Sequence, residues 1–486
     1  MMIPFGMWQP DFPPVGAPHL VRAENCLPTI ASYEPFKSLT VLTNALDARC
    51  LGAVAARDKD QAAHMYAGNS TKLYELEGFT WTDRTKTGGY GPAGDSTRWN
   101  FATFADRLIA TNGIDDPQYI DMSTAATQFD DLAGSPPAAK FVASFGNFVV
   151  LGALATSALS IKWSGFNNSE QWTAGTNQSD EQEFAEGGRL TGLGGVDALY
   201  IFQEKAIRRM IYVGGATIMQ IDKLSDGIGC IEPSSLVQFG NLFFFLAEDG
   251  FYRFDGSSLV PIATGADGGA AFNQWFLNDS ARAYWQNMCA SINPNKKIVC
   301  WAYCSTQSGG VPDKVLTYNW VSKRATVTTY SLEYMLGGAS LGISADDMTG
   351  TDVDTMTVSF DDPSFLGGAY YFAGFNTDHK MGSFTGSSLA ATFEANQQRA
   401  NAKGRATVMS FEPVTDAASV TVAGSASDAP DTEPTFLSAV SMQQSRRCPQ
   451  RGVNGNYISA KAVIAAAQTW TFADGLNVEL KLAGKR

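Results

Sequence analysis

A short pattern that recurs along the middle of the chain constrains the fold more than any other feature of the sequence. Each copy has an aromatic residue, a small residue and an Asn or Asp, followed by an apolar run of strand length. The clearest copies are Phe104–Ala110, Phe145–Leu151 and Phe239–Phe245. With one degenerate and two weaker copies, the Asn or Asp stands at positions 69, 106, 147, 197, 241 and 295, in steps of 37, 41, 50, 44 and 54 residues.

The length of the step is typical of one blade of a β-propeller, about 40–50 residues. Two copies are followed by Asn112-Gly113 and Asp249-Gly250, which are favoured hairpin turns, and then by a strand that bears aromatic residues. We therefore interpret the unit as inner strand, turn and outer strand, with the Asn or Asp tolerating the turn conformation that starts the strand. The sequence predicts an all-β chain with a propeller of six or seven blades over residues 61–394. A long β-sandwich or a solenoid with chance similarities is the alternative.

The segments on either side of the repeat have a different residue pattern. Residues 1–60 do not fit the pattern and are punctuated by proline, so we expect an N-terminal arm that docks elsewhere. The polar segment 339–362 is predicted to be a loop insertion, and the strand-like run 370–374 could close the ring. Alternating stretches at 407–411, 418–422, 457–464 and 476–480 predict a C-terminal β-sandwich over residues 395–486, which the N-terminal arm could complete.

Charge and cysteine content exclude several classes of protein. The formal net charge is −13 and no run of five Lys or Arg occurs, which argues against a tight nucleic-acid binder. Seven cysteines are an odd and sparse set for 486 residues, so we expect free thiols and assembly in a reducing cytoplasm. The N-terminus does not read as a secretory signal. The longest weakly apolar run, Phe148–Ile161, is shorter than the roughly 20 residues that a membrane helix needs.

One segment of the sequence has the spacing of an enzyme motif. Gly338–Gly342 has the spacing of a nucleophile elbow around Ser340, and Asp346 or Asp352 followed by His379 gives the order Ser, acid, His. An elbow, however, needs a strand that enters a helix within an α/β sheet. The surroundings here read as strand, glycine turn and polar loop, so we interpret the motif as a Gly-rich turn and predict no enzymatic activity.

Other candidate sites also have simpler interpretations. The histidines are His19, His64 and His379, without HExxH or paired Cys/His spacing. Cys300 and Cys304 are interpreted as buried thiols. The carboxylate pairs at 115–116, 130–131 and 361–362 could serve a glycosidase, but their neighbouring Pro and Gly favour turn residues. The sequence therefore predicts no catalytic residue, no cofactor-binding residue, no metal ligand and no cofactor.

Aromatic residues provide the rival to a purely structural role. Trp163, Trp172 and Trp320 could stack on sugars in a lectin-like, carbohydrate-binding propeller that recognises a receptor. Packing between blades is the usual role of such side chains. The carbohydrate-binding module remains the alternative function.

A series of short motifs is spread in order over most of the chain. In the N-terminal part these are Asn25–Pro28, Tyr66–Gly68 with Leu73-Tyr74, and Pro117–Asp121. The C-terminal set is the most telling and comprises Cys448–Arg451, Gly455–Tyr457, Thr469–Thr471, Gly475–Val478 and Gly484–Arg486. Taken in this order, the motifs resemble those of the tail-hub, nozzle or packaged-DNA stabilisation proteins of short-tailed phages.

The resemblance implies a structural protein of the virion tail that is assembled in the host cytoplasm. Such proteins form a ring, usually a homohexamer, below the portal and the adaptor (head-to-tail connector). The ring is the exit conduit for DNA, retains the packaged genome and anchors tail fibres or spikes. The expected partners are other copies of the chain, the adaptor, a fibre or spike protein and, through transient non-specific contact, genomic DNA. As a hypothesis, an acidic lumen keeps the sliding DNA from adhering.

Overall fold

The structure is a computed structural model that describes residues 1–91, 94, 97–124, 126–215, 217–266, 268–339, 370–401, 404–430 and 432–482. Strands dominate this described part, in which a single α-helix, α1 (Asn273–Asp279), has seven residues. No helix of the described residues is long and apolar enough to cross a membrane. The predicted all-β class is therefore confirmed.

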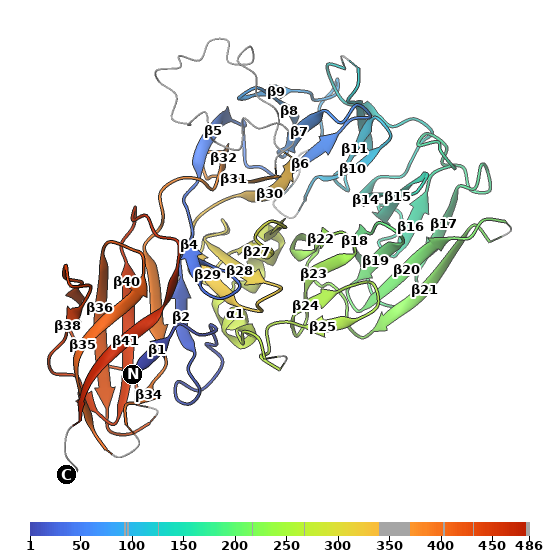
Figure 1. Ribbon diagram of the computed structural model, residues 1–486. Helices are drawn as coiled ribbons and strands as arrows, with labels where there is room; N and C mark the ends of the chain where they lie inside the picture. The colour runs from blue at the N-terminus through green and yellow to red at the C-terminus, as the bar shows by residue number, and fades with distance from the viewer. Residues whose placement is uncertain are drawn as a thin grey trace.

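Six separate sheets in the described part have four strands each, and every neighbouring pair in them is antiparallel. Figure 1 shows these sheets arranged around a common centre, as the blades of a propeller are. Their strands are β6 (Gly52–Arg57), β7 (Ala63–Gly68), β8 (Leu73–Glu77) and β9 (Thr80–Asp83); β10 (Asn100–Phe104), β11 (Arg107–Thr111), β12 (Gln118–Asp121) and β13 (Asp130–Asp131); β14 (Ala139–Phe145), β15 (Phe148–Leu154), β16 (Ser160–Trp163) and β17 (Asp180–Glu183); β18 (Leu190–Gly194), β19 (Leu199–Gln203), β20 (Ala206–Tyr212) and β21 (Met219–Asp226); β22 (Val237–Phe239), β23 (Leu242–Ala247), β24 (Gly250–Phe254) and β25 (Leu259–Pro261); and β30 (Tyr334–Ala339), β31 (Tyr370–Phe375), β32 (Lys380–Ser383) and β5 (Thr40–Ala45).

The ring is closed by a strand from the N-terminal arm. β5 pairs antiparallel with β32, with Thr40 opposite Ser383 and Ala45 opposite Lys380. The first strand of this sheet, β30, lies beside β6 on one side and beside β26 (Cys289–Asn293) on the other. First and last parts of the repeat are thus held together by backbone pairing between segments more than 300 residues apart.

The recurring sequence pattern marks the first hairpin of a sheet. Phe145 pairs with Phe148 and Phe239 pairs with Leu242, so each turn has two residues. The Asn or Asp lies in this turn, as predicted, at Asp106, Asn147 and Asn241, but it does not itself take a positive φ. The positive φ belongs to the small residue before it, 51° at Ala105 and 53° at Gly146, the geometry of a type II′ turn.

Two further details of the predicted unit are corrected. The apolar run after the turn, predicted as the inner strand, is the second strand of its sheet. A second strand is covered on both faces, and all seven residues of β15 are buried. The copy at Asn69 is out of phase, because Asn69 lies between β7 and β8, the second and third strands. β5 and β6 also show that part of the 1–60 arm belongs to the propeller.

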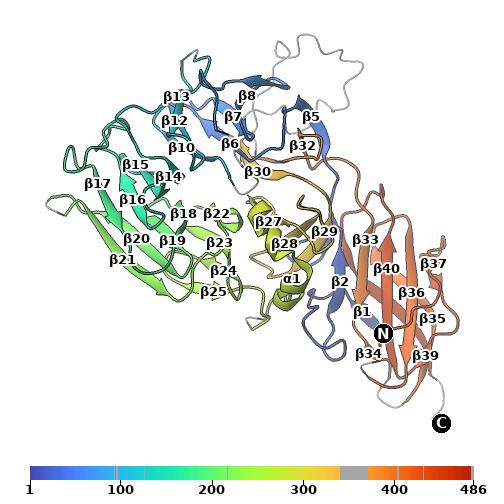
Figure 2. The ribbon, with the colours of Figure 1, turned by 180° about the vertical axis from the view of Figure 1, so that it is seen from behind.

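A β-sandwich lies beside the ring and holds the C-terminal strands together with N-terminal ones (Figure 2). Its first sheet contains β1 (Met2–Pro4), β3 (Cys26–Pro28), β4 (Tyr33–Pro35), β35 (Ala406–Thr415), β38 (Cys448–Pro449), β39 (Asn454–Gly455) and β41 (Ala473–Leu482). Its second sheet contains β2 (Leu20–Glu24), β33 (Ala391–Ala395), β34 (Gln398–Arg399), β36 (Val420–Ser427), β37 (Val440–Ser441) and β40 (Tyr457–Ile464).

The second sheet of the sandwich continues directly into the propeller. β2 pairs in parallel with β29 (Ala325–Thr329), and this joins the strands β26, β27 (Ile298–Tyr303), β28 (Lys314–Asn319) and β29 to the sandwich in one ten-stranded sheet. One hydrophobic core also spans the junction and includes Phe393 of the sandwich and Trp301 of the propeller. In the same core, Trp8 of the N-terminal arm stacks on Phe272 of the propeller, with 5.7 Å between the ring centroids.

Asn25 is the corner at which the chain passes from one sandwich sheet to the other. It lies between β2 of the second sheet and β3 of the first, with a φ of 58° that Asn adopts more readily than most residues. Its side-chain Nδ2 donates to the Ala390 carbonyl at 2.9 Å, and its Oδ1 accepts from the Thr329 amide at 2.9 Å. The same side chain therefore joins β29 to the strand that begins at Ala391.

Replacing Asn25 tests this corner. Asn25→Gly keeps the left-handed backbone but loses two side-chain hydrogen bonds, and should lower the free energy of unfolding by about 1–3 kcal/mol. Asn25→Ala also strains the backbone and should cost about 1 kcal/mol more than Asn25→Gly. Denaturant unfolding of the two variants measures the difference. Equal stabilities of the two variants, or no loss in either, would contradict this account of the corner.

Candidate functional site

The first strands of neighbouring sheets converge on a central cavity of about 630 Å³. Residues from at least five sheets or the segments before them line it, and β18 meets β22 at its wall where the Gly195 amide donates to Gln238 Oε1 at 3.0 Å. Arg98, Lys140 and Arg189 contribute positive charge to the lining, and Glu232 contributes a carboxyl group. The cavity is large enough for a small molecule.

Arg98 is the most enclosed of these cations. Its Nη2 donates to the Gln286 carbonyl at 2.9 Å and its Nη1 to the Thr97 carbonyl at 3.2 Å, so backbone oxygens fix the direction of the guanidinium. Burial lowers the pKa of Arg98, and the positive charge of nearby Arg49 lowers it further.

Glu232 is a carboxyl group of the same lining, and its charge acts on Arg98. It precedes the short 3₁₀ helix η1 (Pro233–Ser235) and caps it, since its Oε1 accepts from the Ser234 amide at 3.1 Å. Burial raises the pKa of Glu232, against the opposing effect of that hydrogen bond and of the Arg98 and Arg189 charges. Burial thus outweighs these opposing effects on the Glu232 carboxyl group.

Lys140 and Arg189 lie nearer to solvent. The Arg189 Nη2 and Nε atoms donate to Glu204 Oε1 at 2.6 and 2.8 Å, which neutralises that guanidinium locally. Lys140 is exposed, and its ammonium has no ion pair within the part of the chain that the structure describes. It is therefore the cation at the cavity that is readiest to accept an anionic group.

Sequence reasoning missed these residues because they are far apart in the chain. The signal was nevertheless present: Arg49, Arg98, Lys140 and Arg189 follow one another at steps of 49, 42 and 49 residues, the length of one propeller unit. Each lies within three residues of the start of a first strand, β6, β10, β14 or β18. We call these four residues the cation set.

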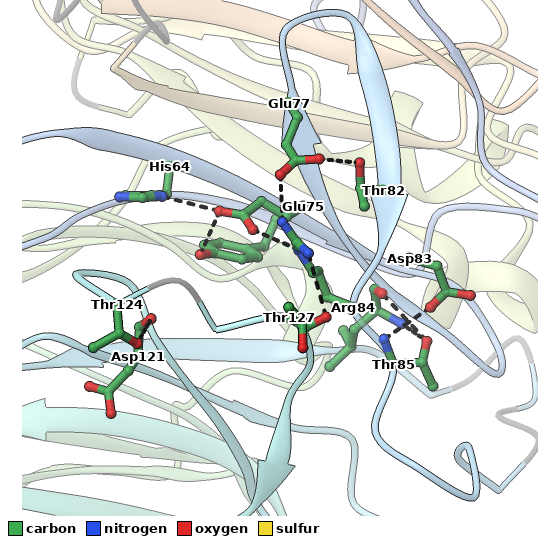
Figure 3. A network of polar contacts seen from close by, with 12 residues as sticks. His64, Glu75, Glu77, Thr82, Asp83, Arg84, Thr85, Asp121, Thr124 and Thr127 are labelled. Atoms are coloured by element: carbon green, nitrogen blue, oxygen red, sulfur yellow. Dashed lines mark hydrogen bonds and ion pairs between the residues drawn. The ribbon is translucent and has the colours of Figure 1, made fainter.

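A second cluster of charged groups joins the first two sheets of the ring (Figure 3). Glu75 on β8 is its centre: Oε1 accepts from the Tyr66 hydroxyl at 3.0 Å and lies 3.2 Å from His64 Nδ1, and Oε2 accepts from Arg84 Nε at 2.9 Å. Arg84 reaches the next sheet, where its Nη1 donates to the Thr127 carbonyl at 3.5 Å.

Protonation of this cluster follows from its contacts. The hydrogen bond to Glu75 raises the pKa of His64 against the effect of burial, and the charge of Asp58 adds to the rise. Burial favours a neutral Glu75, but hydrogen bonds from His64, Tyr66 and Arg84 outweigh it and leave the pKa of Glu75 lowered. When protonated, His64 forms a structural ion pair with the Glu75 carboxylate. Metal-binding groups of three or more His, Cys, Asp or Glu are absent from the described residues.

The residues of the enzyme-like motif are not all described. Ser340, Asp346 and Asp352 lie outside the described residues, as does the carboxylate pair at 361–362. His379 is described and pairs through Nδ1 with Glu333 Oε1 at 2.8 Å.

The remaining carboxylate pairs have structural partners. Asp115 accepts from Asn112 Nδ2 at 2.8 Å within a turn, as predicted. Asp130 and Asp131 form the edge strand β13 rather than a turn, because they pair with β12; Asp131 also accepts from Lys86 at 2.7 Å.

The cysteines and tryptophans behave as interior side chains. All seven cysteines are buried and free, and burial raises the pKa of Cys300 to about 12. Trp163 and Trp172 are buried and donate to the carbonyls of Gln178 and Ser169, which confirms that they pack within the propeller. Trp320 is partly buried against neighbouring aromatic rings.

No family model matches the chain, and no curated protein matches it. Among solved structures it is similar to the computationally designed Ika8 protein, with 10% identity and a TM-score of 0.36 over 74% of this chain and 93% of that one. It is also similar to the β-propeller domain of Cps50 (Swd1) from Myceliophteria thermophila, with 8% identity and a TM-score of 0.37 over 62% and 92% of the two chains. YCF48 bound to D1 peptide matches with 10% identity and a TM-score of 0.33 over 62% and 82%. These likenesses carry no argument about function.

The His64 cluster predicts a pH-dependent contribution to stability. Because the pKa of His64 is raised in the folded state, its contribution is fully present below the unfolded pKa and is lost as the pH rises through the folded pKa. The stability difference between the native protein and His64→Gln should therefore fall by about 1 kcal/mol between about pH 5.5 and pH 8.5.

Denaturant unfolding at both pH values measures this difference. His19→Gln is the matched control, because burial lowers the pKa of His19, and its difference from the native protein should change in the opposite direction. A difference for His64→Gln that is independent of pH, or that grows as the pH rises, would count against the ion pair.

Proposed function

We propose that the chain is a non-enzymatic structural protein of a phage tail, a subunit of the nozzle ring through which the genome leaves below the portal and adaptor. One observation carries the proposal. Segments from both ends of the chain that carry the resemblance in sequence come together in a single sandwich: Asn25–Pro28 at the corner and in β3, Cys448–Pro449 in β38, and Gly475–Val478 in β41.

A conduit subunit must transmit force without coming apart, and the junction suits that role. The sandwich is bonded to the propeller by the β2–β29 pairing and by a shared core, rather than by a flexible linker. In this proposal the six four-stranded sheets and the set β26–β29 are the seven blades of one propeller. The sandwich serves as the platform that contacts neighbouring subunits and the adaptor.

One end of the propeller exposes apolar side chains that suit contact with another copy. Turns between first and second strands and between third and fourth strands lie at the same end of an antiparallel sheet. At this end Val196, Phe239 and Val321 are 63%, 45% and 54% exposed, and Phe239 contacts the ring of Trp320. We call these four residues the hairpin face. Exposed apolar groups favour burial in a protein interface, which supports a homo-oligomer.

The charge of the chain is compatible with passing DNA. A net charge of −13 disfavours tight binding of phosphates, and transient non-specific contact is what a conduit requires. Fibres or spikes would attach to the outer surface of such a ring. The lectin-like alternative gains nothing from Trp163 and Trp172, whose rings are covered.

The ring is tested by sizing and imaging. The purified chain at micromolar concentration should form rings in negative-stain images, and Val196→Asp with Val321→Asp should return it to the monomer, because two buried carboxylates in each contact lose their hydration. Leu224→Asp is the matched control, since Leu224 is 38% exposed on the outer strand β21, and it should leave the rings intact. A native chain that stays monomeric at all concentrations would contradict the ring, and rings that persist in the double variant would contradict the hairpin face as their contact.

A further inference from the structure

Two partly exposed aromatic rings lie together where the sheet β14–β17 meets the sheet β18–β21. Phe166 follows β16, and Tyr212 is the last residue of β20. Their ring centroids are 6.2 Å apart with an interplanar angle of 32°, and the buried ring of Phe148 lies 5.6 and 5.5 Å from them. Phe166 is 37% exposed and Tyr212 is 44% exposed. We call Phe166 and Tyr212 the aromatic pair.

Two amide side chains are bonded directly to the aromatic pair. Gln178 Oε1 accepts from the Tyr212 hydroxyl at 3.0 Å, and Asn177 Nδ2 donates to the Phe166 carbonyl at 3.0 Å. Each bond uses one half of an amide, so Asn177 Oδ1 and Gln178 Nε2 have no partner within the part of the chain that the structure describes. The aromatic pair therefore has one free acceptor and one free donor beside it, each on a side chain that a hydrogen bond holds in place.

The segment 164–179, which carries Phe166 and both amides, is held in one conformation by backbone hydrogen bonds. The Phe166 amide donates to the Asn177 carbonyl at 2.9 Å, and the Asn167 amide donates to a carbonyl in the first turn of the sheet at 2.8 Å. Asn167, Asn177 and Gln178 have positive φ values of 54°, 48° and 67°. Non-glycine residues in this conformation are uncommon and cluster at ligand sites. A segment that is already ordered loses little conformational entropy when it binds a ligand.

An aromatic surface beside free amide atoms is the chemistry that recognises a sugar ring. The face of an aromatic ring is electron-rich and attracts the C–H bonds of a pyranose, while amides donate to its hydroxyl groups and accept from them. A purely apolar partner would bury the free amide atoms without hydrogen bonds. Asp180 lies two residues beyond Gln178 and is exposed, without an ion pair among the described residues. Its negative charge disfavours an anionic sugar.

We propose that the aromatic pair is the binding site for a neutral pyranose unit of an oligosaccharide. The sugar ring stacks on Phe166 and Tyr212, and its hydroxyl groups bond to Asn177 Oδ1 and Gln178 Nε2. Trp163 is buried and supports the site from within, because its Nε1 donates to the Gln178 carbonyl at 2.8 Å. This site is independent of the nozzle proposal and uses other residues than the hairpin face.

Saturation-transfer NMR with the full chain tests the site. Cellohexaose, maltohexaose and chitohexaose are the neutral probes, and hexagalacturonate is the anionic comparison. At least one neutral probe should receive saturation from the protein in a saturable titration, and hexagalacturonate should bind more weakly than that probe. Absence of saturable transfer to all three neutral probes would overturn the proposal. Tighter binding of hexagalacturonate would overturn the choice of a neutral sugar.

Variants of Tyr212 show whether the sugar binds at the aromatic pair. Tyr212→Ala removes the ring and should weaken the binding at least about tenfold, the effect of losing one buried aromatic contact. Tyr212→Phe keeps the ring and loses only the hydrogen bond to Gln178, so it should weaken the binding no more than about threefold. Tyr284→Ala is the matched control, because Tyr284 is 36% exposed on η2 (Arg282–Asn287), and its affinity should not change. Equal weakening in Tyr212→Ala and either other variant would overturn the assignment.

Sizing of the same variants separates a sugar site from a contact between copies. Tyr212 precedes the β20–β21 turn, which lies at the same end of its sheet as the hairpin face. If the aromatic pair binds a sugar, Tyr212→Ala should keep the oligomeric state of the native chain while it loses affinity for the probe. A changed oligomeric state with unchanged sugar binding would overturn the sugar site and assign the aromatic pair to a contact between copies.

Discussion

The parallel pairing of β2 with β29 is the contact on which the rest of the structure depends. Glu24 of the N-terminal arm lies opposite Val327 of the propeller, and the Asn25 amide donates to the Val327 carbonyl at 2.9 Å. Immediately after this contact the chain turns at Asn25 and enters the other sheet of the sandwich. The arm therefore belongs to the sandwich and to the propeller at once, and β5 then closes the ring. A short N-terminal segment holds together parts of the chain that are hundreds of residues apart.

The ring geometry also explains how distant residues form the candidate site. In a propeller, equivalent positions of consecutive units meet near the centre, so a property repeated once per unit becomes concentrated there. The cation set is such a case, and no single member of it is unusual in its own segment. The hairpin face lies at the opposite end of the strands, where the first–second turns of two sheets and the β28–β29 turn carry apolar residues.

Short sequence patterns predicted much of the fold because turn conformation and strand burial are determined by residues close together in the chain. The two-residue turns at Gly146 and Gly240 leave a clear trace, since the small residue must take a positive φ. Alternating polarity predicted the strand 457–464, and β40 spans Tyr457–Ile464. The second strands were visible because both of their faces are covered, so that the sequence is continuously apolar.

What the sequence could not predict depends on long-range contacts. β5 is a half-exposed edge strand, and nothing in its residues shows that its partner is β32. Asn69 resembles the other copies but caps a later turn, where its Oδ1 accepts from the amides of Thr71 and Lys72. The charged lining of the cavity was missed for the same reason, because Arg98, Lys140 and Arg189 become neighbours only when the ring closes. The sequence therefore predicted individual strands and hairpins, but not the contacts between distant ones.

Native-state hydrogen exchange, followed by mass spectrometry at increasing denaturant, tests most directly whether the propeller and sandwich form one unit. If the β2–β29 pairing joins them as described, peptides covering Leu20–Glu24 and Ala325–Thr329 should exchange only through the same large opening that exposes β15 and β40. All four segments should then become exposed together as denaturant is added. Exchange of the sandwich peptides in a separate, lower-energy opening, while β15 stays protected, would contradict the account.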